Sequence, residues 1–171
     1  MMKSSLGFAK DIAIAGIMTA LLTAGKMVLS FIPNIEIVSF MIIMFSVHFG
    51  RKTLISVFAF VLIEGLIYGF GIWWISYVYI WPLLCLISCA VRKNASRFIL
   101  TLISTVFGLF FGFLSSFPYI FMGTANPGIG YALTWWIAGI PYDLIHCIGN
   151  LAVMLCLYVP VSRVLKMVSG D

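Results

Sequence analysis

The run FILTLISTVFGLFFGFLSSFPYIF, residues 98–121, decides the fold because it contains no charged side chain. A helix needs ~20 apolar residues to cross the hydrocarbon core of a bilayer, which is about 30 Å thick. The apolar character of this run is continuous, whereas the strands of a membrane barrel alternate apolar and polar residues. The run therefore predicts a transmembrane helix.

The composition of the whole chain supports the same interpretation. Of the 171 residues, 63% are hydrophobic and 9% are charged, whereas soluble domains carry about 45–50% apolar and about 25% charged residues. These values exclude a soluble enzyme, a nucleic-acid-binding domain and a disordered protein. The net charge of +5 comes from Lys and Arg in short pairs rather than from one basic face, so we expect no nucleic-acid partner.

Breaks between the apolar runs divide the chain into six predicted spans within one domain, residues 1–171. The spans are 8–30, 36–50, 53–70, 73–91, 98–121 and 132–161. The predicted fold class is therefore an all-α integral membrane protein with six transmembrane helices.

The positive charges orient these spans. All Lys and Arg residues except Lys26 fall before or at the start of the first span, after the last span or in every second connection. Connections rich in Lys and Arg face the cytoplasm. We therefore expect both termini to be cytoplasmic in a multi-pass protein of a prokaryotic plasma membrane.

The opposite connections, 31–35, 69–71 and 122–130, hold Gly, Pro, Asn and aromatic residues but almost no charge. Such connections either fold over a solute as a lid or lie in the membrane interface as an aromatic belt. Because they follow Pro33 at the outer end of the first span, Asn34 and Glu36 are predicted to belong to a lid.

Away from the predicted cytoplasmic ends of the spans, five ionisable residues lie inside them: Lys26, Glu36, Glu64, Asp143 and His146. Each costs about 2.5–3.5 kcal/mol on insertion scales and usually marks function or buried pairing. Their depths place them in the outer half or near the middle of the membrane, which predicts a cavity open to the outside. The structural alternative pairs Asp143 with His146, or Glu64 with Lys26.

Helical spacing extends the candidate site along the sixth span. Asp143, His146 and Asn150 lie at i, i+3 and i+7 and so share one helix face. Gly139 and Pro141 precede them and are expected to open the helix. Aromatic residues near the outer ends suit a ring-bearing solute, although an interfacial belt explains part of them. The predicted substrate-binding residues are Asn34, Glu36, Glu64, Tyr68, Trp73, Trp74, Tyr119, Trp135, Asp143, His146 and Asn150.

The first span carries a separate pattern of small residues. Gly16, Ala20 and Ala24 form one stripe, with Ala13 nearby. Small residues at this spacing allow another helix to approach closely. The stripe predicts either docking of a partner protein or packing against another span of the same chain.

Motifs that carry enzymatic chemistry do not occur. The chain has no Walker A motif, no HExxH zinc motif and no GxSxG nucleophile elbow. Its two His residues supply too few ligands for a zinc site. Cys85, Cys89, Cys147 and Cys156 lie in apolar runs and are expected to pack as small residues. We therefore expect no enzymatic activity, no metal and no cofactor.

Three stretches carry a resemblance to a known family: IPNIEIV (32–38), EGLIYGFGIWW (64–74) and GIPYDLIHCIGN (139–150). Together with the six spans and the small-residue stripe, they resemble the S components of energy-coupling factor (ECF) transporters, in particular the cobalamin-type CbrT branch. The resemblance implies a subunit that binds a vitamin-like solute from outside, with cobalamin as the leading solute. It also implies docking through the first span onto a membrane coupling subunit joined to two cytosolic ATPases, which alone use ATP.

Other functions stay open. S components of the same fold carry other solutes, such as pantothenate, a pyrimidine or thiamine-like precursor, or a nucleoside. A stand-alone proton-coupled carrier would use Asp143, His146 and Glu64 as a proton relay. A membrane scaffold would bind no solute.

Overall fold

The computed structural model describes residues 5–122 and 127–169, with side chains from Gly7 onward. Lys3 and part of the 122–130 connection lie outside these residues. The elements are α1 (Ser5–Leu29), α2 (Val38–Phe49), η1 (Gly50–Lys52), α3 (Thr53–Tyr68), α4 (Ile72–Ala90), η2 (Arg92–Asn94), α5 (Arg97–Ser115), η3 (Phe117–Ile120) and α6 (Ile129–Ser169), where η marks a short 3-10 helix. No strand occurs in either described segment, so the all-α prediction is confirmed.

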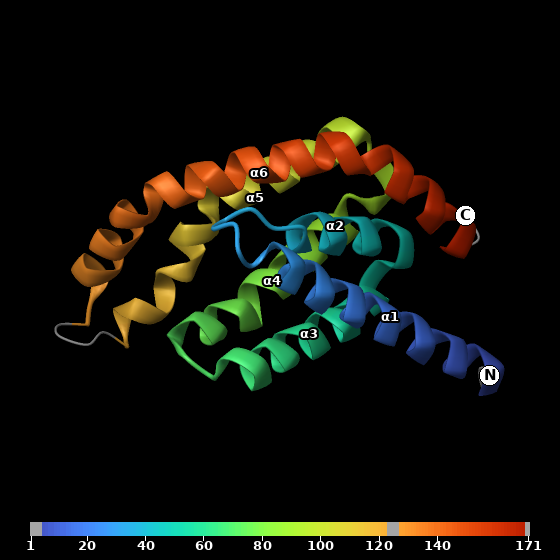
Figure 1. Ribbon diagram of the computed structural model, residues 1–171, viewed down its shortest axis with the longest axis horizontal. Helices are drawn as coiled ribbons and strands as arrows, with labels where there is room; N and C mark the ends of the chain where they lie inside the picture. Colours follow the sequence, from blue (N-terminus) through green and yellow to red (C-terminus); the bar gives the residue numbers. More distant parts are fainter. Residues whose placement is uncertain (1–4, 123–126, 170–171) are drawn as a thin grey trace.

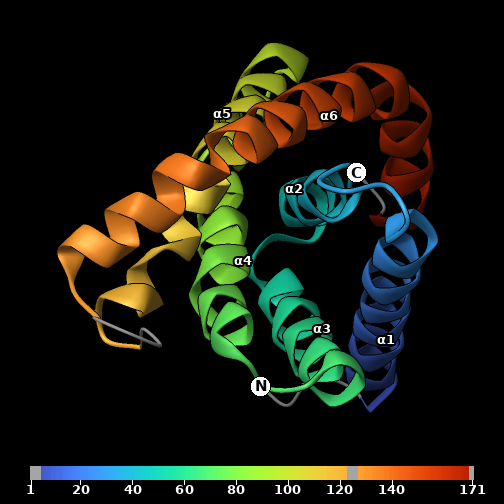
Figure 2. The same ribbon diagram turned by 60° about the vertical axis from the view of Figure 1, so that its left-hand side comes forward.

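Helix α2 lies at the centre of the arrangement, and α1, α3, α4 and α6 surround it (Figure 2). Its sequence explains this position, because VSFMIIMFSVHF carries apolar side chains on all faces. A helix that is hydrophobic all round is stable only when it is buried. Phe40, Ile42 and Met44 are accordingly at the core. Helices α5 and α6 form a long hairpin along one side of this group (Figure 1).

Four of the described helices are long and apolar enough to cross a membrane: α1, α4, α5 together with η3, and α6. Helix α2 has 12 residues and α3 has 16, both short of the ~20 that a full span needs. The six predicted spans thus coincide with six helices, of which four have the length and composition of a span.

The sixth predicted span is longer than expected and unbroken. Helix α6 runs from Ile129 to Ser169, beyond 132–161 on both sides, with Pro141 and Pro160 inside it. The expectation that residues 139–141 open this helix is therefore wrong. A proline removes one hydrogen bond from the helix, and the extensive packing of α5 along α6 supports the continuous helix.

Two of the predicted basic connections meet at one end of the bundle. Lys52 Nζ lies 2.7 Å from Asp11 Oδ1, which joins η1 to α1. The Arg92 guanidinium donates to the carbonyl oxygen of His48 at 2.8 Å, which joins η2 to α2. The opposite end of α1 leads into the 30–37 connection. The bundle therefore has a basic end and, at the far end of α1, a weakly charged one.

Candidate solute-binding site

A cavity of about 460 Å³ lies where the C-terminal end of α1 and the 30–37 connection face α3, α4, α5 and α6. Small-molecule sites have volumes of about 300–1,000 Å³, so the cavity has the size of such a site. Its aromatic lining consists of Tyr68, Trp73, Tyr77, Trp81 and Phe111. Its ionisable and amide side chains are Lys26, Asn34, Glu36 and His146.

The 30–37 connection folds back over the end of α1 to form one wall. Asn34 has a φ of 58°, in the left-handed region that Asn tolerates better than most residues. Gly25 of α1 allows the close return, because a Cβ atom there would meet Ile37 Cγ2 at 2.6 Å. Asn34 and Glu36 both line the cavity. That this connection opens and closes over a solute stays a prediction.

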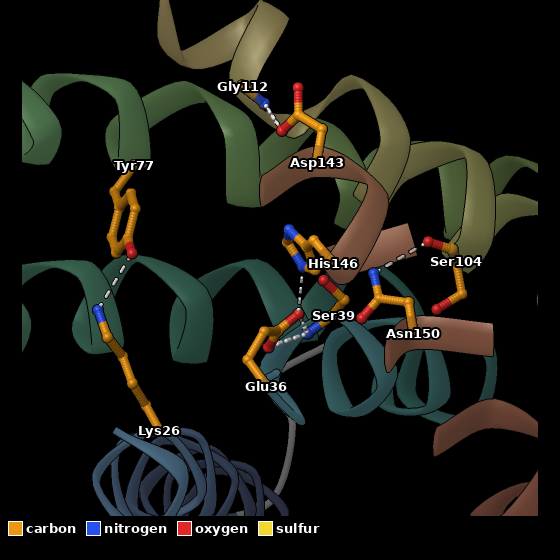
Figure 3. Close-up of polar contacts among 9 residues, drawn as sticks. All are labelled: Lys26, Glu36, Ser39, Tyr77, Ser104, Gly112, Asp143, His146 and Asn150. Carbon is orange, nitrogen blue, oxygen red and sulfur yellow. Dashed lines mark hydrogen bonds and ion pairs between the residues drawn. The ribbon is translucent and has the colours of Figure 1, made fainter. Parts of the chain in front are cut away.

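Glu36 joins α6 to α2 at the cavity (Figure 3). Its carboxylate accepts from the Ser39 N–H at 2.9 and 3.1 Å, in the first turn of α2, where the helix dipole favours negative charge. His146 Nε2 lies 3.1 Å from Glu36 Oε1, across 110 positions of sequence. The His146 ring also packs on Phe111 with a centroid distance of 4.9 Å. The structure thus pairs His146 with Glu36 and not with Asp143.

Lys26 supplies the second polar contact of the cavity. Its Nζ lies 2.5 Å from Glu64 Oε2 and 3.2 Å from the Tyr77 hydroxyl. The same ammonium lies 5.6 Å from the ring centroid of Tyr68, 5.5 Å from that of Trp73 and 4.4 Å from that of Tyr77, all within cation–π range. Glu64 is fully buried and does not line the cavity. The pairing of Glu64 with Lys26 therefore holds the ammonium at the cavity wall.

Asp143 and Asn150 share a helix face with His146 but contact α5 (Figure 3). Asp143 Oδ1 accepts from the Gly112 N–H at 2.8 Å. Asn150 Nδ2 donates to the carbonyl oxygen of Ser104 at 3.0 Å. Neither side chain lines the cavity. Helical spacing groups Asp143, His146 and Asn150 on one face of α6, but the structure separates them. That face meets the 30–37 connection at His146 and α5 at the other two residues.

Three predicted aromatic residues also lie away from the cavity lining. Trp74 Nε1 donates to the carbonyl oxygen of Val61 at 2.8 Å and so fixes the start of α4 against α3. The rings of Tyr119 and Trp135 stack between η3 and α6 with a centroid distance of 4.6 Å. Each of the three has a partner within the protein, so their contacts fit packing.

Among the charged and aromatic side chains of the lining, the predicted set omitted four: Lys26, Tyr77, Trp81 and Phe111. The signal for two of them is in the sequence of α4, where Trp73, Tyr77 and Trp81 follow at i, i+4 and i+8. Their rings meet edge to face at centroid distances of 5.1 and 5.4 Å. An aromatic repeat along one helix face therefore identifies the cavity wall more directly than the number of aromatic residues near one end.

The small-residue stripe of α1 faces outward. Gly16, Ala20 and Ala24 are exposed, whereas Met18 and Leu22 on the opposite side are buried. A Cβ atom on Gly16 would have nothing within 4 Å. A groove of about 1070 Å³ runs along α1 and α3, with Gly16 and Ala20 in its lining. Within the described part of the chain, the stripe is not used for packing against another span.

No group of three or more His, Cys, Asp or Glu side chains in residues 5–122 and 127–169 is placed to hold a metal ion. Comparisons with protein families, curated proteins and solved structures found no match. A functional assignment therefore depends on the geometry of the cavity, on the exposed stripe and on the resemblance described above.

Proposed function

We propose that the chain is the substrate-binding subunit of an ECF-type importer. It captures a vitamin-like solute from outside and delivers it through a partner ATPase module. The observation that carries this proposal is the cavity beneath the 30–37 connection, with its aromatic walls, Lys26 and the Glu36–His146 pair. A few polar groups on an aromatic lining suit a compact ring-bearing solute.

The proposal includes six crossings of a prokaryotic plasma membrane with both termini in the cytoplasm. Helices α2 and α3 would cross together with the connections that flank them. This is physically feasible because α2 is surrounded by protein, where irregular backbone at membrane depth finds partners. With the basic end of the bundle toward the cytoplasm, the cavity would lie on the outside.

The exposed stripe supports docking through α1. Gly16 and Ala20, with Ile55 and Ala59 of α3, line the apolar part of a groove into which a partner helix could pack closely. The chain has no ATP-binding motif, so the energy would come from a membrane coupling subunit joined to two cytosolic ATPases. By the resemblance, the docked subunit would topple in the membrane and release the solute inward.

The size of the cavity bears on the solute. At about 460 Å³ it lies in the lower half of the range for drug-sized ligands. Cobalamin, a corrinoid ring with a nucleotide tail, is larger than such ligands and would require the 30–37 connection to move away. By volume alone, the cavity as it stands admits the smaller solutes, such as pantothenate, a pyrimidine or thiamine-like precursor, or a nucleoside.

Co-expression of the tagged chain with a coupling subunit and two ATPases tests the proposal. We expect the four proteins to copurify, the isolated chain to bind its solute, and uptake into vesicles to require ATP and the whole complex. Absence of copurification together with solute uptake by the isolated chain would overturn it.

A stand-alone proton-coupled carrier is the second candidate, favoured by the Glu36–His146 pair in the cavity. An acid and an imidazole at hydrogen-bond distance can exchange a proton when a solute binds. This function predicts uptake by the isolated chain under a proton gradient, abolished by His146→Gln.

A further inference from the structure

We infer that the solute of this cavity carries a positive charge on or beside a flat ring, an inference that rests on the proposed solute-binding function. It goes beyond that function because neither the cavity size nor the resemblance fixes the charge of the solute. The positive charge of the solute is inferred from three features: the aromatic rings of the lining, the pairing of Lys26 with Glu64, and the carboxylate of Glu36.

The rings of the cavity already hold one cation. The Lys26 ammonium lies within 5.6 Å of the centroids of Tyr68, Trp73 and Tyr77, and ring faces attract cations through their quadrupole. Trp81 and Phe111 extend the same lining, with a centroid distance of 5.4 Å between them. A second cation with a flat ring would find the same kind of surface there.

Lys26 is already paired and is therefore poorly placed to recognise an anionic solute. Its Nζ lies 2.5 Å from Glu64 Oε2, and Glu64 is fully buried. If the ammonium turned to a solute carboxylate, Glu64 would be left as a buried charge without its partner, which is strongly unfavourable. The Lys26–Glu64 pair is thus a neutral part of the wall.

Glu36 supplies a negative charge that the neutral Lys26–Glu64 pair does not balance. Oε1 is bonded to His146 Nε2 and the Ser39 N–H, whereas among the described residues Oε2 accepts from the Ser39 N–H alone. A carboxylate oxygen has two acceptor sites, so Oε2 keeps one for a solute. Among the described residues that line the cavity, Lys26 is the sole Lys or Arg, and its charge is balanced by Glu64. The carboxylate of Glu36 therefore has no Lys or Arg at the cavity to balance its charge.

Three ring probes of similar size and different charge test this inference: N-methylquinolinium as the cation, quinoline as the neutral compound at neutral pH, and quinoline-2-carboxylate as the anion. Binding to the full purified chain in detergent is followed by quenching of tryptophan fluorescence, since Trp73 and Trp81 line the cavity. We expect N-methylquinolinium to bind about tenfold more tightly than quinoline, and the carboxylate to bind most weakly.

Glu36→Gln is the matched variant, because its amide oxygen can still accept from Ser39. It should weaken N-methylquinolinium binding about tenfold or more and change quinoline binding by less than about threefold. Asp11→Asn makes the same chemical change at the ion pair with Lys52 on the basic end and should leave all three affinities unchanged. The melting temperature of each variant confirms that it is folded.

Equal binding of N-methylquinolinium and quinoline would overturn the inference. It would also be overturned if quinoline-2-carboxylate bound more tightly than N-methylquinolinium and lost this binding in Lys26→Met. Both results would leave the proposed solute-binding function standing, because a ring compound still binds. Failure of all three probes would also overturn the inference, and copurification with the coupling subunit and ATPases then decides the proposed function separately.

Discussion

The cavity and the α5–α6 interface both bury polar side chains of α6, but they use them differently. At the interface, Asp143 and Asn150 bond backbone groups of Gly112 and Ser104 directly. At the cavity, His146 bonds a side chain, Glu36, that keeps acceptor capacity toward an open space. The three α6 residues lie within two turns of one helix, so the neighbour that each one meets decides its role.

Glycine distinguishes the two regions further. A Cβ atom on Gly112 would meet the Asp143 carboxylate at 2.5 Å, and one on Gly108 would meet Asn150 Nδ2 at 3.0 Å. The interface is thus closed by two glycines that bring the helices together. Aromatic side chains surround the cavity instead and hold the helices apart. Interface variants should therefore change stability, and cavity variants should change solute affinity.

The largest effect is expected from Gly112→Leu. The new side chain would collide with Asp143 and displace it from the Gly112 N–H, so the free energy of unfolding should fall by about 3 kcal/mol or more. Thermal unfolding in detergent measures this loss. Gly16→Leu is the control, because a Cβ atom there has nothing within 4 Å, and it should not lower stability. A Gly112→Leu protein that melts at the temperature of the wild type would contradict the close approach of α5 and α6 at Gly112.

Asp143→Ala should lower the free energy of unfolding by about 1–3 kcal/mol, because it removes a charge-assisted hydrogen bond at a buried crossing. The affinity for N-methylquinolinium should not change. Asp143→Asn keeps an acceptor for the Gly112 N–H and should recover part of the stability. Tenfold weaker probe binding with an unchanged melting temperature would place Asp143 in the binding site, as the spacing of α6 alone suggests.

His146→Ala should weaken N-methylquinolinium binding about tenfold, equivalent to about 1.4 kcal/mol, because Glu36 and the Phe111 ring both lose their contact with the imidazole. Asn150→Ala, one turn further along the same face, is the matched variant and should lower stability without changing affinity. If His146→Ala and Asn150→Ala weakened probe binding equally, the distinction between the cavity and the α5–α6 interface would not hold.

Ala20→Trp should have the smallest effect on both properties. The side chain of Ala20 is exposed on α1, so stability should stay within ~0.5 kcal/mol of the wild type and probe affinity should be unchanged. Copurification with the coupling subunit should be lost, because a large side chain prevents close helix approach. Loss of probe binding would instead connect the stripe to the cavity.

The helices could be predicted from the sequence because continuous apolar runs and basic connections are local signals. The second span was predicted to be short, and α2 and α3 are shorter still than the predicted spans 36–50 and 53–70, since those runs include connection residues such as Glu36 and Phe70. The continuity of α6 was missed for a similar reason: local signals at Pro141 indicate a break, but packing on α5 supports the helix.

The candidate site was predicted in part. Intramembrane charges identified Glu36 and His146, which both line the cavity. Lys26 was recognised as an intramembrane charge but was not included in the predicted binding set. Periodicity placed Asp143 on the same face as His146, but it cannot indicate which neighbour that face meets. The pairing of Glu36 with His146 joins residues 110 positions apart, and no local pattern encodes such a contact.

The length of α6 has a consequence for the surrounding bilayer. Its 41 residues extend over about 60 Å at ~1.5 Å per residue, twice the ~30 Å of the hydrocarbon core. A straight helix of this length would project about 46 Å at a tilt of about 40°, the upper end of the usual range, but α6 is arched and so spans less than its path length (Figure 1). The stacked Tyr119 and Trp135 rings near its start suit the headgroup region, which would bring that end out of the hydrocarbon. The hairpin, rather than the bundle around α2, would then set how deeply the molecule sits in the lipid and how far it thickens the membrane beside it.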